Sequence, residues 1–134
     1  MRTSAIVLGI AVLLVSGCTQ KEPIRLGFLG GLTGRVADLG EAGRDGTLFA
    51  IEEVNAAGGV NGRSVELLIQ DDQQDAKTAA QATQTLLDAR VDAIIGPMTS
   101  AMGEAVLPVL GRSDRVMVSP TITASKLAGK DDLL

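Results

Sequence analysis

The sequence predicts an α/β fold in which an open parallel sheet is flanked by helices. Short apolar segments with strand composition alternate with longer segments whose apolar residues recur at helical spacing. Hydrophobic residues make up 46% of the chain and aromatic residues only 1%, so an aliphatic core is expected, as in parallel sheets covered by helices. The 134 residues suffice for one domain of ordinary size.

The elements follow one another as strand, helix, strand, from residue 24 onward. We expect strands over residues 24–29, 64–70, 91–95 and 115–118, and helices over residues 40–57, 76–89 and 100–111. Because strands alternate with helices, right-handed crossovers and a parallel sheet are expected. Residues 124–134 have the composition to begin another helix.

Glycine, proline and a capping residue mark the ends of these elements. The first helix is expected to end in the left-handed conformation at Gly58 and the glycine after it, and Asn61-Gly62 indicates a tight turn. Asp75 is expected to cap the second helix. Pro108 removes a hydrogen bond within the third helix, which predicts a kink or a restart there.

Residues 1–17 are interpreted as a lipoprotein signal peptide. Arg2 precedes an apolar run over residues 5–15 that would span about 16 Å as a helix, well short of a ~30 Å bilayer core. The only cysteine, Cys18, follows small residues at the end of this run, which resembles a bacterial lipobox. Acyl chains on Cys18 would hold the protein at a membrane surface, since each buried methylene contributes about 0.8 kcal/mol. A plain secretory signal with an incidental cysteine is the alternative.

The loop after the third predicted strand is the expected ligand contact. Gly96-Pro97 ends that strand, and the side-chain oxygen of Thr99 or Ser100 is expected to cap the helix that follows. Open α/β sheets bind ligands at the carboxyl ends of their strands. A helix N-terminus at that edge favours an anion such as a carboxylate or a phosphate.

Composition excludes or disfavours several kinds of chemistry. The chain has no histidine and one cysteine, which excludes Ser-His and Cys-His nucleophile pairs, imidazole metal ligands and an intrachain disulfide. The net charge of -4 and the lack of a long Lys/Arg cluster argue against nucleic-acid binding.

Two further patterns are assigned structural roles. Asp71 and Asp72 are paired carboxylates that suit a hard cation such as Mg²⁺, but no further acidic ligand is evident at a neighbouring strand end. Capping and loop hydrogen bonds are therefore the preferred interpretation of this pair. The glycines of residues 27–34 lack the spacing G-x-G-x-x-G and the Lys-Ser/Thr ending of a phosphate loop, and are assigned to turns. Neither a metal nor a cofactor is predicted.

A series of segments carries a family resemblance. The segments are I-R-L-G-F-L-G-G-L-T-G (residues 24–34), G-T-L-F-A-I-E-E-V-N-A-A-G-G-V-N-G-R (46–63), E-L-L-I-Q-D-D (66–72), D-A-I-I-G-P (92–97) and V-M-V-S-P-T-I-T (116–123). Together they resemble the N-terminal lobe of type I periplasmic solute-binding proteins of ABC transporters, most closely the branched-chain amino acid and amide receptors. The resemblance runs from Ile24 to about Leu127. It implies a partial first lobe over residues 24–134, which a tether over residues 18–23 would join to the predicted signal peptide of residues 1–17.

The resemblance also implies which residues hold a ligand. In the family the first lobe holds the α-carboxylate of the ligand with hydroxyls and backbone amides, and the matching positions here are Ser100, Thr121 and Thr123. Thr99 belongs to the same predicted contact loop as Ser100. Leu39 stands where an aromatic side chain often lies over the ligand, so that stacking contact is lost.

Some family members carry a disulfide in this lobe. Gln74 and Thr99 occupy the two positions that this disulfide joins, so the bond is absent here.

The function implied is that of a non-catalytic receptor. A surface lipoprotein, exported to the periplasm or cell surface and anchored through Cys18, would capture a branched-chain or other amino acid, or an amide, for an ABC permease. Ligand binding would shift a two-lobe protein toward its closed form. The alternative is a Rossmann-like nucleotide-binding or enzymatic domain that uses the same sheet edge, although it lacks the usual fingerprints. Because a partner lobe is missing, this chain alone is expected to bind poorly and to expose apolar surface.

Overall fold

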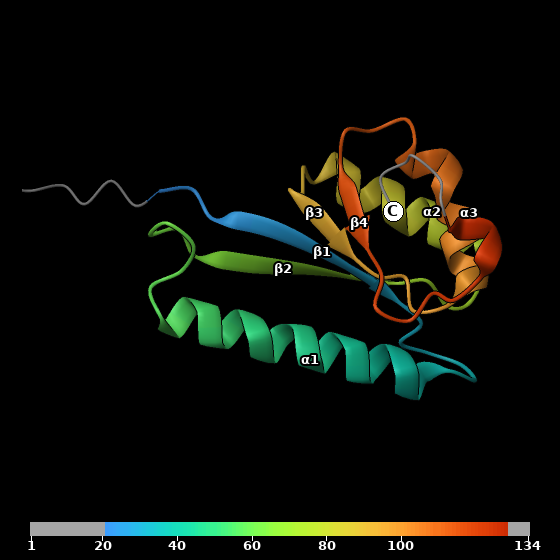
Figure 1. The fold of residues 1–134 in the computed structure, drawn as a ribbon, viewed down its shortest axis with the longest axis horizontal. Helices are drawn as coiled ribbons and strands as arrows, with labels where there is room; N and C mark the ends of the chain where they lie inside the picture. The colour runs from blue at the N-terminus through green and yellow to red at the C-terminus, as the bar shows by residue number, and fades with distance from the viewer. Residues whose placement is uncertain (1–20, 129–134) are drawn as a thin grey trace, which may run out of the picture.

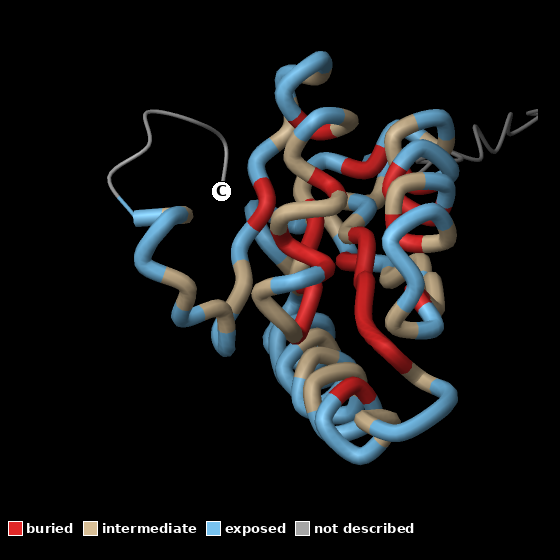
Figure 2. The backbone as a smooth tube through the Cα atoms, turned by 90° about the vertical axis from the view of Figure 1, so that its right-hand side faces the viewer, coloured by how far each residue is buried: buried red, intermediate tan, exposed pale blue. Residues whose placement is uncertain are grey.

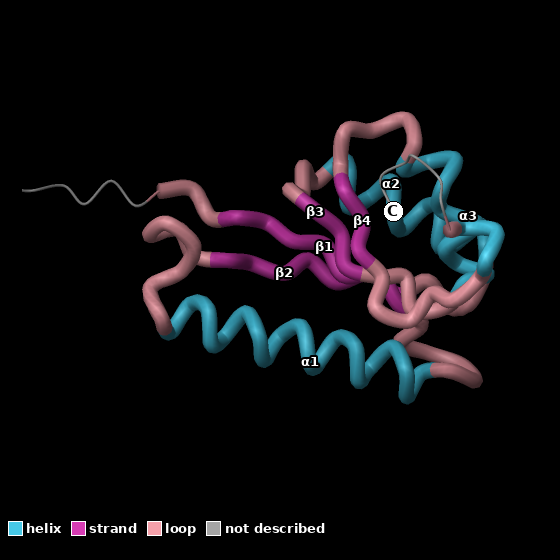
Figure 3. Tube along the Cα trace, viewed as in Figure 1, coloured by secondary structure: helices cyan, strands magenta, loops and turns pink. Residues whose placement is uncertain are grey.

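Residues 21–128 are described by the structure, a computed structural model, and they form one parallel sheet with helices on both faces (Figures 1 and 3). The elements are β1 (Ile24–Gly30), α1 (Ala37–Ala56), β2 (Val65–Asp71), α2 (Ala76–Asp88), β3 (Ala93–Ile95), α3 (Ser100–Leu110), β4 (Val116–Val118) and the short 3-10 helix η1 (Ser125–Leu127). The sheet order is β2-β1-β3-β4, and every pair is parallel. The predicted fold class is thereby confirmed.

The third strand is shorter than the sequence predicts. It begins at Ala93, since Val91 is still hydrogen-bonded back to the end of α2. The Val91 amide donates to the Leu86 carbonyl oxygen at the end of α2, and the Asp92 amide donates to the Arg25 carbonyl oxygen of β1. The helix expected after residue 124 is present within the described residues only as η1, and residues 129–134 lie outside them.

The face of the sheet covered by α2 and α3 holds the main core. Figure 2 shows the buried positions gathered along the strands and the helix sides that face them. Its buried members are Leu29, Ala79, Ala82, Leu86, Val91, Ile94, Met102, Val106, Leu110 and Met117. On α2, Ala79, Thr83 and Leu86 are buried against this core, and Ala80 is half-buried. Two helices side by side therefore cover this face.

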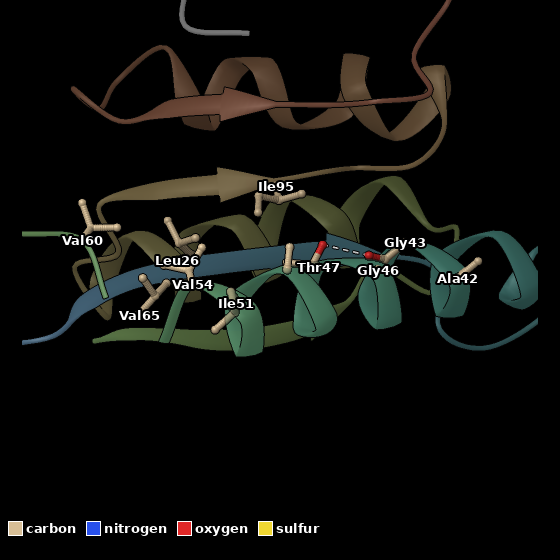
Figure 4. A pocket seen from close by; sticks show the side chains of 11 residues that line it. Leu26, Ala42, Gly43, Gly46, Thr47, Ile51, Val54, Val60, Val65 and Ile95 are labelled. Carbon is tan, nitrogen blue, oxygen red and sulfur yellow. Dashed lines mark hydrogen bonds between the residues drawn. The ribbon is translucent and has the colours of Figure 1, made fainter. Parts of the chain in front are cut away.

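The opposite face is covered by α1 alone (Figure 1). Thr47 and Ile51 of α1 line an apolar cavity of about 490 Å³ against Leu26 of β1 and Ile95 of β3 (Figure 4). Beyond this cavity, Val116 and Val118 of β4 are 47% and 59% exposed. A single helix is too narrow to cover four strands, since a helix is about 10 Å across and strands are about 4.8 Å apart. The expected exposure of apolar surface is confirmed on this face.

The expected turns and caps are largely confirmed. Gly58 has a φ of 97°, and Asn61 and Gly62 form a turn closed by a bridge between Val60 and Arg63. The Asp75 side chain accepts a hydrogen bond from the Thr78 amide at 2.8 Å and so caps α2. The third helix runs unbroken through Pro108 to Leu110, so the predicted restart does not occur.

The predicted signal peptide and most of the predicted tether lie outside the described residues. The part of the tether that is described contacts the turn before β2: Arg63 donates to the carbonyl oxygens of Glu22 and Pro23, and Lys21 donates to the carbonyl oxygen of Asn61. Among the helices of residues 21–128, none has the length and apolar composition needed to cross a bilayer.

Candidate functional site

The four strands end at one edge, where the loops that follow them meet. Two glycines bring the backbone together there. Gly96 has a φ of 111°, and a side chain at this position would overlap the Leu29 carbonyl oxygen of β1. A Cβ at Gly40 in α1 would overlap the Gly31 carbonyl oxygen. The loops after β1 and β3 therefore pack against their neighbours more closely than side chains would allow.

Ser100 joins the start of α3 to the segment that follows β4. Its Oγ accepts hydrogen bonds from the backbone amides of Thr123 and Ala124, at 3.2 and 3.3 Å. The N-cap residue Thr99 makes no side-chain capping bond. The expectation that Thr99 or Ser100 caps α3 through its side chain is therefore wrong, because both hydroxyls have partners in other loops.

Two more hydroxyls join the same pair of loops. Thr121 Oγ1 donates to the Met98 carbonyl oxygen at 2.7 Å, and Ser119 Oγ donates to the Pro97 carbonyl oxygen at 2.6 Å. The sequence analysis did not single out Ser119, whose only signal was its place in a Ser-Pro turn. The structure thus brings three of the predicted residues, Ser100, Thr121 and Thr123, into one small region.

The N-terminus of α3 in this region suits an anion. With no side-chain cap, the amides of its first turn keep their hydrogen-bonding capacity, and the helix dipole places partial positive charge there. No acidic residue lies in that first turn. A nearby ion pair between Glu104 and Lys126, at 2.6 Å, ties α3 to η1.

Thr99 faces the end of β2. Its Oγ1 donates to Gln74 Oε1 at 3.2 Å, and Gln74 in turn donates from N and Nε2 to Asp72 Oδ1 at 2.8 and 2.9 Å. The two positions that the family resemblance pairs as a disulfide are therefore in direct side-chain contact, with a hydrogen bond between them.

Asp71 holds the loop between β1 and α1. Its carboxylate accepts from the Leu32 amide at 2.8 Å, the Thr33 hydroxyl at 2.7 Å and the Gln73 amide at 2.9 Å. Partial burial raises the pKa of Asp71, but these hydrogen bonds outweigh burial and leave the pKa below its ordinary value. The interpretation of the Asp71-Asp72 pair as a source of loop hydrogen bonds is confirmed. Residues 21–128 contain no cluster of three groups able to hold a metal ion.

Asp72 is completely buried, which is unusual for an acidic residue. Gln74 supplies the donors to Oδ1, whereas Oδ2 has no hydrogen-bond partner. Burial raises the pKa of Asp72, the two bonds from Gln74 lower it in part, and the charge of Asp71 raises it further, for a net upward shift. Ionisation of Asp72 therefore destabilises the folded protein.

Leu39 comes from a different element than the other predicted residues. It belongs to the first turns of α1, which covers the opposite face of the sheet from α3, and its side chain is 38% exposed. The region of Ser100 and Thr123 adjoins a hollow of about 280 Å³ lined in part by Ser119, Thr123 and Ser125. The larger apolar cavity beneath α1 lies away from this region and contains none of the predicted ligand residues.

Open parallel sheets commonly bind small ligands at the carboxyl edge of their strands, the edge where the helix N-terminus and the hydroxyls lie here. A family model described as periplasmic binding protein matches residues 23–132, and the chain belongs to this family. The resemblance inferred from the sequence motifs is confirmed.

Individual relatives agree with this assignment. The chain is 31% identical over 109 residues to the leucine-, isoleucine-, valine-, threonine- and alanine-binding protein of Pseudomonas aeruginosa, covering 81% of this chain and 29% of that protein. It is 24% identical over 130 residues to the Leu/Ile/Val-binding protein of Escherichia coli, covering 97% and 35%. These relatives are named as binding proteins, so the nucleotide-binding or enzymatic alternative is not favoured.

Solved structures match as well. LivJ from Streptococcus pneumoniae, a branched-chain amino acid transporter substrate-binding protein in complex with isoleucine, has a TM-score of 0.74 and 31% identity, covering 76% of this chain and 30% of that one. The leucine-binding protein LivK of Thermotoga maritima has a TM-score of 0.70 and 29% identity, covering 77% and 29%. The chain thus spans about a third or less of the length of these relatives.

Replacing Asp72 by Asn is expected to raise the free energy of unfolding at pH 7. Because the pKa is raised above its ordinary value of 3.8 in the folded protein, stability falls as the pH rises through the raised value. The amide keeps an acceptor for Gln74 and removes the buried charge, so we expect a gain of about 1 kcal/mol at pH 7 that shrinks as the pH falls toward ~4. Urea unfolding of both proteins at several pH values measures this difference in the free energy of unfolding.

The matched control is Asp88→Asn. Asp88 is an exposed carboxylate that accepts a hydrogen bond from Gln84 Nε2 at 2.8 Å, so the same change of charge occurs without burial. The control is expected to show no comparable gain at pH 7. A loss of stability at pH 7 in Asp72→Asn would contradict the raised pKa.

Proposed function

We propose that this chain forms the first lobe of a substrate-binding component of an ABC importer. The lobe captures a small amino acid or amide, most simply a branched-chain amino acid, by its carboxylate or carbonyl end, and it catalyses no reaction. The names of the relatives and the isoleucine complex of the similar LivJ structure support this ligand class.

One observation carries the proposal, the hydrogen-bond state of Ser100. A hydroxyl has two acceptor positions and one hydrogen, and the amides of Thr123 and Ala124 occupy both acceptor positions. The hydrogen of Ser100 is therefore directed away from both amides, toward a further acceptor. By contrast, the hydroxyl hydrogens of Thr99 and Thr121 are donated to Gln74 and Met98. Ser100 is thus the hydroxyl best placed to donate to a carboxylate.

The remaining predicted residues take supporting roles in this proposal. The first-turn amides of α3 offer further donors to the same carboxylate, while Thr121 holds the loop in place through Met98. The exposed Thr123 and Leu39 side chains belong to the rim. The ammonium and side chain of the ligand are left for a second lobe, so this lobe alone binds weakly, with a Kd on the order of 1 mM.

The proposal also includes export of the protein and its anchoring to a membrane. The lobe is carried to the periplasm or the cell surface, and acyl chains on Cys18 hold it there for delivery to an ABC permease. The family assignment supports export, and the position of the only cysteine after an apolar run supports the anchor.

Replacing Cys18 by Ser is expected to release the protein from membranes. The hydroxyl of serine cannot take the thioether-linked lipid, so the buried methylenes that hold the chain at the surface are lost. Fractionation of cells that express the two forms measures this, and the protein should move from the membrane to the soluble fraction. Equal membrane association of both forms would contradict the anchor.

Leucine is expected to shift the backbone amide resonances at the start of α3 and over residues 121–124. Nuclear magnetic resonance titration of the Cys18→Ser form with L-leucine reads millimolar affinities directly. Ser100→Ala removes one donor to a charged group and is expected to weaken binding about tenfold.

The control for this titration is Ser64→Ala. Ser64 is exposed just before β2, and its backbone carbonyl oxygen accepts a hydrogen bond from the Ile24 amide, which the substitution leaves in place. It is expected to bind leucine like the parent. Resonance shifts confined to other regions of the lobe, or an unchanged affinity of Ser100→Ala for leucine, would contradict the proposed binding site.

A further inference from the structure

We infer that Gln74 is a positioning residue that keeps the N-terminus of α3 open for the ligand by holding the Thr99 side chain away from it. This inference rests on the proposed function, because it concerns the same edge of the sheet. Its structural part, the position of Thr99, is testable without any ligand.

The Thr99 side chain has two competing partners. Thr99 is the N-cap residue of α3 and has extended backbone angles, φ −128° and ψ 150°, which are the angles of a capping residue. Threonine in such a position normally accepts hydrogen bonds from the amides two or three residues on, here Ala101 and Met102. Instead, Thr99 Oγ1 donates to Gln74 Oε1 at 3.2 Å, and no side-chain cap forms.

The Gln74 side chain is held firmly in the place that this requires. Its Nε2 donates to Asp72 Oδ1 at 2.9 Å, which turns Oε1 toward Thr99. A Cβ added at Gly31 would lie only 2.8 Å from Gln74 Nε2, so the loop after β1 closes over the amide from the other side. The amide thus lies between three loops of the ligand edge.

The backbone of Gln74 is held as well. Gln73 and Gln74 have φ values of 51° and 54°, a left-handed conformation that non-glycine residues rarely adopt. The amides of these two residues donate to Asp71 Oδ1 and Asp72 Oδ1 at 2.9 and 2.8 Å. Backbone strain of this kind persists only where surrounding contacts maintain it. Here the contacts are the ones that aim Gln74 at Thr99.

The charged groups around Gln74 all come from its own segment of the chain. Asp71 and Asp72 lie at the end of β2, and Asp75 follows Gln74 directly. The other two residues that contact the Gln74 side chain are Gly31 after β1 and Thr99 before α3, and neither has a titratable side chain. The fully buried Asp72 depends on the donors of Gln74, because its second oxygen has no partner. Asp72 therefore fixes which end of the Gln74 amide faces Thr99.

The test is a rescue experiment. Gln74→Leu removes the acceptor for Thr99, which then turns to cap α3, and leucine must displace that cap. We expect leucine to bind about fivefold more weakly, the effect of one typical cap. The double variant Gln74→Leu/Thr99→Val has no capping hydroxyl, so its affinity is expected to return to within twofold of the parent. A merely structural role of Gln74 would not be rescued by removing a second hydrogen-bonding group.

A ligand-free readout accompanies the titration. In Gln74→Leu either the Ala101 or the Met102 amide is expected to exchange with solvent several-fold more slowly than in the parent, because the Thr99 hydroxyl then accepts a hydrogen bond from it. This protection is expected to vanish in the double variant. The matched control is Gln84→Leu, which removes an exposed glutamine that also donates to an aspartate, and it should change neither measurement.

The outcomes separate the two proposals. If leucine shifts no resonance of the parent, the proposed function fails, and the exchange rates still decide the role of Gln74. Unchanged exchange and affinity in Gln74→Leu, or a double variant as weak as Gln74→Leu, overturn the inference. Should the loss of the Nε2 donor to Asp72 prevent folding, the same variants in the Asp72→Asn background give the same comparison.

Discussion

Two backbone amides converge on one hydroxyl, and the arrangement of the ligand edge depends on that contact. Thr123 and Ala124 both donate to Ser100 Oγ, so the segment after β4 is tied to the first residue of α3. Thr121 and Ser119 reinforce the same junction by donating to the carbonyl oxygens of Met98 and Pro97. These bonds hold Ser100 Oγ, an acceptor of two amides, beside the uncapped N-terminus of α3, and the proposed carboxylate contact rests on this arrangement.

The sheet that carries this edge is unevenly covered. Helices α2 and α3 cover one face, where side chains such as Leu86 and Ile94 are fully inaccessible. The other face has α1 alone and leaves Val116 and Val118 of β4 exposed. Parallel sheets are ordinarily buried on both faces. The chain spans about 30% of the length of several of its relatives.

The order of elements, the parallel sheet and the Asp75 cap could be predicted because each depends on local patterns: periodicity, strand composition and a capping residue before a helix. For Asp71 only the hydrogen bond from Gln73 is local, whereas those from Leu32 and Thr33 come from the loop after β1, which the sequence did not identify as a partner. The capping of α3 was predicted wrongly, because sequence shows that Thr99 and Ser100 have hydroxyls but not which distant loop supplies a competing partner. The sequence placed Gln74 only at a disulfide position of the family and did not predict its hydrogen bond to Thr99, because that bond joins two loops that lie 25 residues apart. Leu39 was predicted from family position, and its role stays a prediction.

The most direct measurement compares leucine with leucinamide, which keeps the ammonium and side chain but replaces the carboxylate by a neutral amide. Both are titrated into the protein while the amide resonances of Ser100 and Ala101 are followed. If the edge binds the negative end of the ligand, leucine shifts these resonances with an affinity at least about tenfold higher than that of leucinamide, as expected for hydrogen bonds to a charged group. Equal affinities, or shifts confined to the apolar cavity under α1, would contradict the account.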